Sequence, residues 1–232
     1  MYTEESSNMN DRDITGQETV KRDPLEWEEV SCEHVVQDEW IDFRRLAYRF
    51  PDGKIYEPYY TYSRRSYVVI VASDEEGKFL CVRQYRQGIR QVTTEFVAGG
   101  IERKDGREYA AAPDGQNTNV AAGAGNEQDP QTEDPLAAAK RELREETGCE
   151  SDEWTHLLTV PSNATIADNY AHIYAARNCR RVTGQNLDAM EFLNVERYTA
   201  QEIDKMIAEG KFQQAMHITG WLLYNKYLES DR

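Results

Sequence analysis

The most chemically informative stretch of the chain is residues 141–149, Arg-Glu-Leu-Arg-Glu-Glu-Thr-Gly-Cys. If this stretch is helical, Glu142, Glu145 and Glu146 stand at i, i+3 and i+4 and share one face. Carboxylates at that spacing repel one another, and a hard cation such as Mg²⁺ removes the repulsion because carboxylate oxygens are its preferred ligands. Arg141 lies one turn before Glu145, where its guanidinium can orient a carboxylate. The pattern therefore predicts a metal-binding helix face, against the alternative of a solvated acidic surface.

The helix that would carry these side chains has signals at both ends. Asp134 is a typical N-cap residue, and Pro135 suits the first helical position because no hydrogen bond needs its missing N–H there. Gly148 readily adopts the left-handed conformation that ends a helix. We therefore expect a helix from about residue 134 to residue 147.

The spacing of these residues resembles the second half of the Nudix box, Gly-x5-Glu-x7-Arg-Glu-aliphatic-x-Glu-Glu-x-Gly-aliphatic. Glu133 lies eight positions before Arg141, as the box requires, and Cys149 stands where an aliphatic residue is usual. Segment 96–102, Phe-Val-Ala-Gly-Gly-Ile-Glu, is similar to the strand and turn that enter the box. If Gly100 is the box glycine, the first glutamate of the box is expected at position 106 rather than 133, so the loop is 27 residues longer than the pattern.

The extra residues, at about 105–132, are small and polar, almost without large apolar side chains. Such a segment buries too little apolar surface to offset the entropy of ordering it, and a long surface loop adds little closure entropy. We interpret it as a passive surface insertion, which we favour over the alternative of a lid that closes over the substrate.

The composition bounds the class of protein. A chain of 232 residues with 39% hydrophobic residues suits one globular domain with an added subdomain. A net charge of −15 argues against binding nucleic acid or an anionic membrane, and no apolar run approaches the length of a membrane span. The four cysteines are scattered, so neither a zinc site nor a disulfide framework is indicated. The acidic N-terminus does not resemble a signal peptide, and we expect a cytoplasmic protein.

The order of the predicted elements indicates the architecture. Residues 1–23 are polar and are predicted to be a disordered tail, residues 24–63 a small antiparallel β subdomain, and residues 64–232 the main domain. Apolar runs bounded by turn residues predict strands at about 28–36, 40–50, 56–63, 66–72, 78–85, 91–97, 154–160, 170–177 and 191–196. Helices are expected at 200–208 and 212–228, the second with its apolar side chains at Phe212, Ile218, Leu222 and Leu223. This mixture predicts an α+β protein with a mixed sheet flanked by helices.

That architecture is similar to the Nudix αβα sandwich, and further motifs resemble the ADP-ribose pyrophosphatase branch of the family. These motifs are Trp40-Ile41-x-Phe43, Phe50-Pro51-Asp52-Gly53, Val82-Arg83-Gln84-Tyr85-Arg86, Pro161-Ser162-Asn163-Ala164, Ala171-His172-Ile173-Tyr174 and Leu187-Asp188-x-x-Glu191. The resemblance implies hydrolysis of the pyrophosphate bond of a nucleoside diphosphate derivative. ADP-ribose or an ADP-sugar is the expected substrate, with AMP and a sugar phosphate as products.

The resemblance also implies a metal site. One to three Mg²⁺ ions, with Mn²⁺ as a possible substitute, would be held by Glu142, Glu145, Glu146 and the backbone carbonyl of Ala98. Arg141, Glu145 and Glu146 would then be catalytic residues. As general base we favour Glu191, which follows the Leu187-Asp188 signature, over Asp168.

The expected substrate contacts come from two regions. Arg86 stands where relatives place an arginine that contacts phosphate or ribose, and Arg83 would point to the opposite face of the same strand. Trp27, Trp40 and Tyr62 are candidates for stacking on the base, although each could equally pack in the core or at an interface. In relatives the N-terminal strands exchange between subunits, so we expect residues 24–63 to form a homodimer interface.

Two alternative functions stay open at this stage. A GDP-sugar or a broader range of nucleoside diphosphate sugars could be the substrate. A non-catalytic Nudix module could bind ADP-ribose without cleaving it, although the intact Arg141, Glu142, Glu145 and Glu146 argue against this.

Overall fold

The computed structural model of the chain describes residues 23–104, 106 and 131–230. Nearly all of the predicted tail at 1–23, and the predicted insertion apart from residues 106, 131 and 132, lie outside the described residues. The chain divides into two compact units, Met1–Glu33 with Arg45–Tyr59, and His34–Arg44 with Tyr60–Arg232. In the described part of the chain, no helix is both long enough and apolar enough to cross a membrane.

The N-terminal strands form a three-stranded sheet in the order β1-β2-β3, with β1 at Glu28–Gln37, β2 at Asp42–Arg49 and β3 at Ile55–Ser63. The turn between β2 and β3 needs Gly53, whose φ of 83° is in the region that favours glycine. Aromatic rings cluster within the first unit, where Trp27 stacks on Phe50 at a centroid distance of 4.1 Å and Tyr59 lies 5.6 Å from Trp27. Much of the aromatic content of this region therefore packs within its own unit.

The second unit contains a seven-stranded mixed sheet. Its strands are β4 (Tyr67–Asp74), β5 (Phe79–Arg86), β6 (Gln91–Gly100), β7 (Cys149–Glu150), β8 (Glu153–Pro161), β9 (Tyr170–Arg181) and β10 (Leu193–Tyr198). The order is β10-β5-β6-β4-β9-β7, and β8 pairs with β9. Strands β4 and β9 are parallel, and the other pairs are antiparallel. The predicted strands are all present, whereas β7 was not predicted because two residues are too short to show a periodic pattern.

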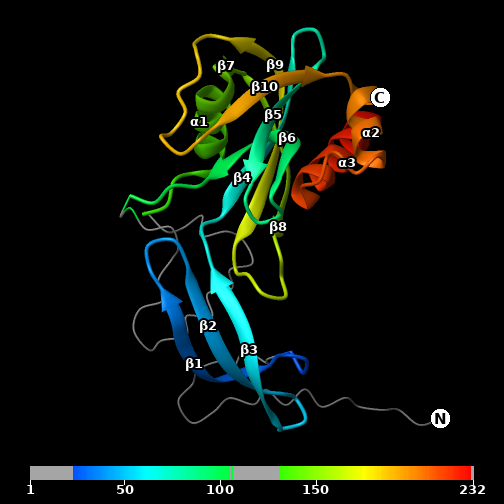
Figure 1. The fold of residues 1–232 in the computed structure, drawn as a ribbon. Helices are drawn as coiled ribbons and strands as arrows, with labels where there is room; N and C mark the ends of the chain where they lie inside the picture. Colours follow the sequence, from blue (N-terminus) through cyan, green and yellow to red (C-terminus); the bar gives the residue numbers. More distant parts are fainter. Residues whose placement is uncertain (1–22, 105, 107–130, 231–232) are drawn as a thin grey trace, which may run out of the picture. The chain divides into compact units, whose positions relative to one another are not determined.

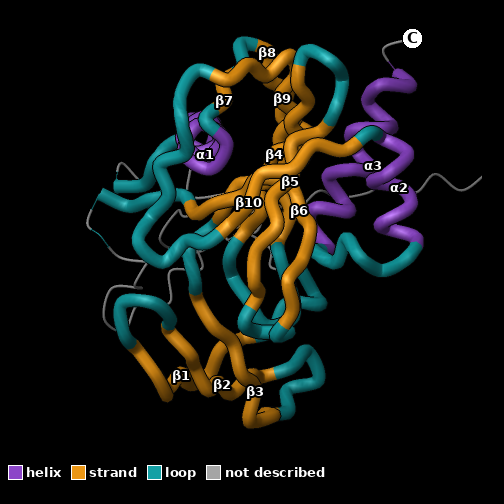
Figure 2. Tube along the Cα trace, turned by 45° about the horizontal axis from the view of Figure 1, so that its top comes forward, coloured by secondary structure: helices purple, strands orange, loops and turns teal. Residues whose placement is uncertain are grey.

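In the described part of the chain, three helices cover the two faces of this sheet. Helix α1 (Pro135–Thr147) lies on one face, and α2 (Ala200–Ala208) and α3 (Ala215–Ser230) lie on the other (Figures 1 and 2). One apolar core joins the sheet to Ala138, Ala139 and Leu143 of α1. A second core lies on the opposite face and contains Ile203, Phe212, Trp221 and Tyr224. The predicted αβα sandwich with a mixed sheet is therefore confirmed.

The helix ends follow the sequence signals closely. The Asp134 side chain accepts a hydrogen bond from the N–H of Ala137 at 2.8 Å, and Gly148 ends α1 with a φ of 70°. The prediction for the last helix needs correction. Leu222 is 62% exposed and Phe212 precedes α3, whereas Trp221 and Tyr224 are buried. The helix is apolar on more than one side, so the sequence pattern alone did not show which side faces the sheet.

Candidate functional site

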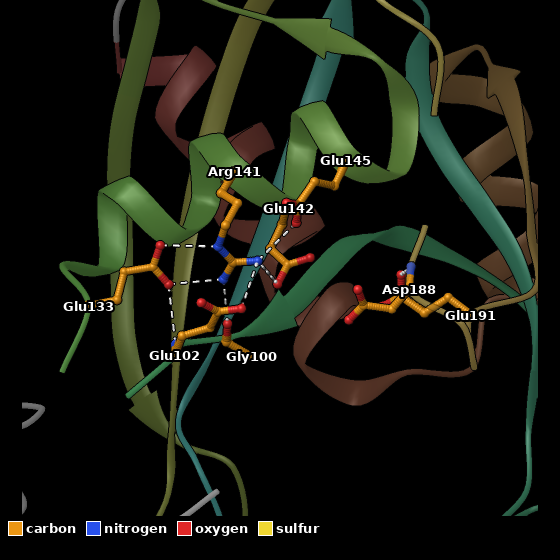
Figure 3. A network of polar contacts seen from close by, with 8 residues as sticks. All are labelled: Gly100, Glu102, Glu133, Arg141, Glu142, Glu145, Asp188 and Glu191. Atoms are coloured by element: carbon orange, nitrogen blue, oxygen red, sulfur yellow. Dashed lines mark hydrogen bonds and ion pairs between the residues drawn. The ribbon is translucent and has the colours of Figure 1, made fainter. Parts of the chain in front are cut away.

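Arg141 is the centre of a polar network on α1 (Figure 3). Its Nε and Nη2 donate to the two carboxylate oxygens of Glu133 at 3.1 and 2.9 Å. Its Nη1 donates to Glu142 at 2.8 Å and to Glu145 at 3.0 Å, while Nη2 also donates to the carbonyl of Gly100 at 2.9 Å. The arginine thus fixes three carboxylates and joins α1 to the end of β6, as predicted for its pair with Glu145.

The two ends of the insertion meet directly. The N–H of Glu133 donates to the carbonyl of Glu102 at 2.9 Å, and the N–H of Glu102 donates to the Glu133 carboxylate at 3.2 Å. One residue further on, Arg103 and Thr132 form an antiparallel bridge, and the N–H of Lys104 donates to the carbonyl of Gln131 at 2.7 Å. This short neck brings Glu133 beside Gly100 and Arg141, so the two halves of the box form one site despite the residues between them.

Glycine is required at the end of β6 because charged side chains occupy the space of a β-carbon. A Cβ on Gly99 would lie 2.0 Å from a carboxylate oxygen of Glu142, and a Cβ on Gly100 would lie 2.5 Å from Cδ of Arg65. Any larger residue at position 99 would displace Glu142 from its present position. The Gly-Gly pair therefore makes room for the carboxylate on one side and for an arginine on the other.

Two of the predicted metal ligands are buried and have perturbed acidities. Burial raises the pKa of Glu142 to about 7, although Arg141 lowers it in part and the charges of Glu145 and Glu191 add to the rise. Burial raises the pKa of Glu146 well above its usual value, and the charges of Glu142 and Glu191 contribute in the same direction. One carboxylate oxygen of Glu146 is buried without any hydrogen-bond partner. Such an atom lacks the compensation that a buried carboxylate normally requires.

The donor set fits a hard cation on two grounds. The orphaned oxygen of Glu146 has no protein donor, and Glu142 and Glu145 on the same helix supply further oxygen ligands. Among the described residues, no three His, Cys, Asp or Glu side chains stand close enough together to hold an ion in their present positions. In these positions, Nη1 of Arg141 donates to one oxygen of Glu142 and to one oxygen of Glu145. Metal ligation by these residues and by the Ala98 carbonyl stays a prediction.

Arg86, the predicted substrate-binding arginine, is held by a buried acid. Its Nε and Nη2 each donate to Glu95 at 2.8 Å, and Glu95 also accepts from the Thr93 hydroxyl at 2.7 Å. The Glu95 side chain is fully buried, whereas that of Arg86 is 33% exposed. The charge of Arg86 lowers the pKa of Glu146, which opposes the effect of burial there. Arg86 therefore acts electrostatically on the carboxylate cluster, which consists of Glu142, Glu145 and Glu146.

The other predicted substrate contacts lie in different surroundings. Arg83 is about half exposed and contacts Glu196 at 3.4 Å. Trp27 packs on Phe50 within the first unit. Trp40 lies in the short bend that begins at Asp38, and its side chain is 48% exposed. The Asp38 carboxylate accepts a hydrogen bond from the Trp40 N–H at 2.8 Å.

The two candidates for the general base differ in their partners. Asp168 accepts hydrogen bonds from Nη2 of Arg44, at 2.8 Å, and from the Ser63 hydroxyl. Glu191 lies on the loop before β10 and accepts from the N–H of Asp188 at 3.0 Å (Figure 3). The charge of Glu191 raises the pKa of both Glu142 and Glu146, so Glu191 interacts electrostatically with these two carboxylates. The structure thus relates Glu191 to the cluster and pairs Asp168 with an arginine.

Sequence analysis did not single out Glu95 or His217. Nδ1 of His217 accepts from the N–H of Phe96 at 3.0 Å, and its Nε2 lies 3.8 Å from the Glu95 carboxylate. The one sequence signal for Glu95 was its position as a charged residue inside the apolar run of β6. Such a position indicates a buried ion pair, because a buried acid normally has a cationic partner. No local signal indicated His217, which comes from α3 and meets β6 only in the folded protein.

Comparisons with known proteins agree with this geometry. No family model matches the chain. A methanol dehydrogenase activator of Bacillus methanolicus is 27% identical over 145 residues, which cover 62% of this chain and 63% of that protein. The match therefore spans less than two thirds of the length of that relative. An ADP-ribose pyrophosphatase of Bacillus subtilis (strain 168) is 23% identical over 198 residues, which cover 82% of this chain and 88% of that protein.

A solved structure described as an ADP compounds hydrolase superposes with a TM-score of 0.70, covering 91% of this chain and 98% of that chain. Its identity of 18% shows a shared fold. Together with the geometry around Arg141, these likenesses support an ADP-ribose pyrophosphatase-like Nudix hydrolase. Its Nudix box is assembled around Arg141 from two segments, Gly99–Glu102 and Glu133–Gly148, that the short neck joins.

Proposed function

We propose that this Nudix hydrolase cleaves the pyrophosphate bond of a nucleoside diphosphate derivative, with ADP-ribose or an ADP-sugar as substrate. The observation that carries the proposal is the orphaned, buried carboxylate oxygen of Glu146 beside Glu142, within a box whose other polar contacts are complete. The relatives named as an ADP-ribose pyrophosphatase and an ADP compounds hydrolase support the choice of substrate. The products would be AMP and a sugar phosphate.

The proposal includes Mg²⁺, or Mn²⁺ in its place, held by Glu142, Glu145, Glu146 and the carbonyl of Ala98. When bound, such an ion lowers the pKa of a coordinated water and stabilises negative charge on phosphate oxygens. The residues of the chain position the reactants. Arg141 orients Glu142 and Glu145, while the Glu95 carboxylate aims the Arg86 guanidinium at a phosphate group.

Glu191 is the proposed general base. Its carboxylate would accept the proton of the attacking water, and the hydrogen bond that it accepts from the N–H of Asp188 limits its rotation. Asp168 is less suited to that role because its carboxylate is already engaged by Arg44 and the Ser63 hydroxyl.

We further propose that the active form is a homodimer built through the N-terminal sheet. Apolar side chains of β1 and β3 are exposed in the single chain, among them Val30 (42%), Val35 (48%) and Ile55 (49%). A second copy of the chain would remove this surface from water. Trp27 and Trp40 are proposed as substrate contacts from the same region.

One experiment tests the activity and the role of Glu146 together. ADP-ribose, ADP-glucose, GDP-mannose, NADH and diadenosine polyphosphates would be incubated with the purified protein in EDTA and in Mg²⁺. We expect release of AMP from ADP-ribose or ADP-glucose with Mg²⁺ alone, and a decrease in kcat by at least about 100-fold in Glu146→Gln. Glu150→Gln, which changes a surface carboxylate paired with Arg144, is the matched control and should keep full activity. Binding of ADP-ribose without turnover in the wild type would show instead a non-catalytic binding module.

A further inference from the structure

Strands β4 and β6 separate at one point of the mixed sheet. In the described part of the chain, the pairing between them ends at Ile70 and Val97. The next N–H of β6, that of Phe96, donates to Nδ1 of His217 at 3.0 Å. A side chain of α3 therefore supplies the partner for this backbone group, at the position where the two strands diverge.

His217 reaches a network that serves the opposite face of the sheet. Successive side chains of a strand alternate between its two faces, so Glu95 and Phe96 point in opposite directions. The Phe96 ring lies in the second core, on the side of α2 and α3. Glu95 holds Arg86, whose charge lowers the pKa of Glu146 on α1. Yet Nε2 of His217 lies 3.8 Å from the Glu95 carboxylate, so α3 contacts the ion pair where β4 and β6 separate.

The hydrogen bond from Phe96 fixes the tautomer of His217. A backbone N–H can only donate, so Nδ1 carries no proton and the proton of the neutral ring is on Nε2. Burial lowers the pKa of His217 to about 4, although the charge of Glu95 opposes the shift, so the ring is neutral at neutral pH. The proton is therefore on the nitrogen nearest to the Glu95 carboxylate. The dipole of this N–H stabilises the carboxylate, because the interior holds little water to screen the interaction.

Each oxygen of the Glu95 carboxylate is held by Arg86 and by one other group. Oε1 accepts from Nε of Arg86 at 2.8 Å and from the Thr93 hydroxyl at 2.7 Å. Oε2 accepts from Nη2 of Arg86 at 2.8 Å and faces Nε2 of His217. Thr93 and His217 together limit the rotation of the carboxylate, and the direction of the bidentate guanidinium follows from it.

We infer that His217 is a positioning residue for substrate binding, which orients Glu95 and, through Glu95, the guanidinium of Arg86. The inference rests on the proposed function, in which Arg86 binds a phosphate group of the substrate. His217 is 3% exposed, so in this role it contacts Glu95 and not the substrate. It therefore affects the affinity for the substrate, while the chemical step depends on the residues of the Nudix box.

A double-mutant cycle between His217 and Arg86 tests the inference. His217→Asn keeps an acceptor for the Phe96 N–H but is too short to reach Glu95. It should raise KM for ADP-ribose by about 3- to 10-fold and change kcat by less than about twofold. In the Arg86→Ala background the same change should have no further effect, because the guanidinium through which His217 acts is absent. His217→Gln, whose longer side chain carries an N–H towards Glu95, should restore most of the affinity.

Two further measurements separate orientation from stability. Met216→Ala is the matched control, because Met216 is the neighbour of His217 on α3 and packs against the second core. It should lower the melting temperature and leave KM unchanged. The Kd of ADP-ribose is measured by calorimetry in EDTA for every variant, so that the cycle is also obtained without turnover. If Arg86→Ala does not fold, Arg86→Lys replaces it, because an ammonium group cannot form the bidentate pair.

Three outcomes would overturn the inference. The first is an equal effect of His217→Asn with and without Arg86, which would show a general structural role. The second is an unchanged KM and Kd in His217→Asn, or an equal rise in Met216→Ala. The third is a wild type that neither binds nor hydrolyses ADP-ribose. If calorimetry gives the expected coupling but ADP-ribose is not hydrolysed, His217 has the inferred role and the proposed activity fails. Hydrolysis without coupling removes the role of His217 and leaves the activity.

Discussion

Glu95 and Arg86 form a bidentate ion pair in which both N–O distances are 2.8 Å and the carboxylate is fully buried. Burial alone would raise the pKa of Glu95, but the hydrogen bonds from Arg86 and the proximity of His217 bring it below its usual value. The acid is therefore ionised and holds the arginine, whose charge lowers the pKa of Glu146. A short chain of contacts from α3 through β6 thus fixes the orientation of the Arg86 guanidinium.

The pair predicts a combined effect on stability and binding. Glu95→Gln should lower the free energy of unfolding by about 1.5–3 kcal/mol, because a hydrogen-bonded charge pair loses one ion in the interior. It should also raise KM for ADP-ribose more than it lowers kcat, because Arg86 loses its fixed orientation. Urea unfolding and steady-state kinetics measure the two effects. Asp152→Asn, which removes the exposed pair with Arg180, is the control and should change neither quantity measurably.

His217 predicts how stability changes with pH. Burial lowers its pKa from 6.5 to about 4, although the negative charge of Glu95 opposes the shift. At pH values between 4 and 6.5, His217 therefore binds a proton in the unfolded chain but not in the folded protein. The contribution of His217 to the free energy of unfolding is thus fully present above pH 6.5 and is lost as the pH falls towards 4. The loss should amount to at most about 3 kcal/mol. Urea titrations at successive pH values measure this loss. His217→Gln should reduce the slope of the free energy of unfolding against pH, whereas His156→Gln should leave that slope unchanged.

The orphaned oxygen of Glu146 predicts an unusual stability pattern. In EDTA, Glu146→Gln should melt at a higher temperature than the wild type, since it removes a buried carboxylate that lacks full compensation. Adding Mg²⁺ should raise the melting temperature of the wild type, because a ligand that binds the folded state stabilises it, and should leave the variant unchanged. Thermal scans with EDTA and with Mg²⁺ measure the melting temperatures of the wild type and the variant. An equal Mg²⁺ shift in both proteins would remove Glu146 from the metal site.

The neck of hydrogen bonds predicts that the inserted residues are dispensable. Replacing residues 107–130 by a short glycine-rich turn should shift the melting temperature by no more than a few degrees and leave kcat within about twofold, because closure entropy varies slowly with loop length. Glu102, Lys104, Gln131 and Glu133 keep their paired backbone bonds in this variant. Kinetics with ADP-ribose measure the result. A large rise in KM would show that the segment acts as a lid over the substrate.

The exposed N-terminal sheet predicts self-association. Light scattering at micromolar concentration should give the mass of two chains, and Val35→Lys should give one chain by placing a charge on the apolar surface. Lys54→Gln, in the turn between β2 and β3, is the control and should remain a dimer. A mass of one chain with full activity in the wild type would rule out a dimer that shares its sites.

The sequence alone determined most of the elements and which carboxylates share one helix. Local signals decide helix α1, because Asp134 supplies its cap, Pro135 its first turn and Gly148 its left-handed end. The same is true of the spacing that places Glu142, Glu145 and Glu146 on one helix. These features depend on residues within one or two turns of one another, so the order of residues is sufficient to predict them.

Tertiary structure decided which of these residues meet. The neck between Glu102 and Glu133 completes the box across a long separation, and the pairing of Glu95 with Arg86 and His217 joins β5, β6 and α3. It also buried Glu146 deeply enough to leave one oxygen without a donor, which the helical spacing does not imply. Such contacts depend on how strands and helices distant in sequence pack around one sheet, and periodicity describes only one element at a time.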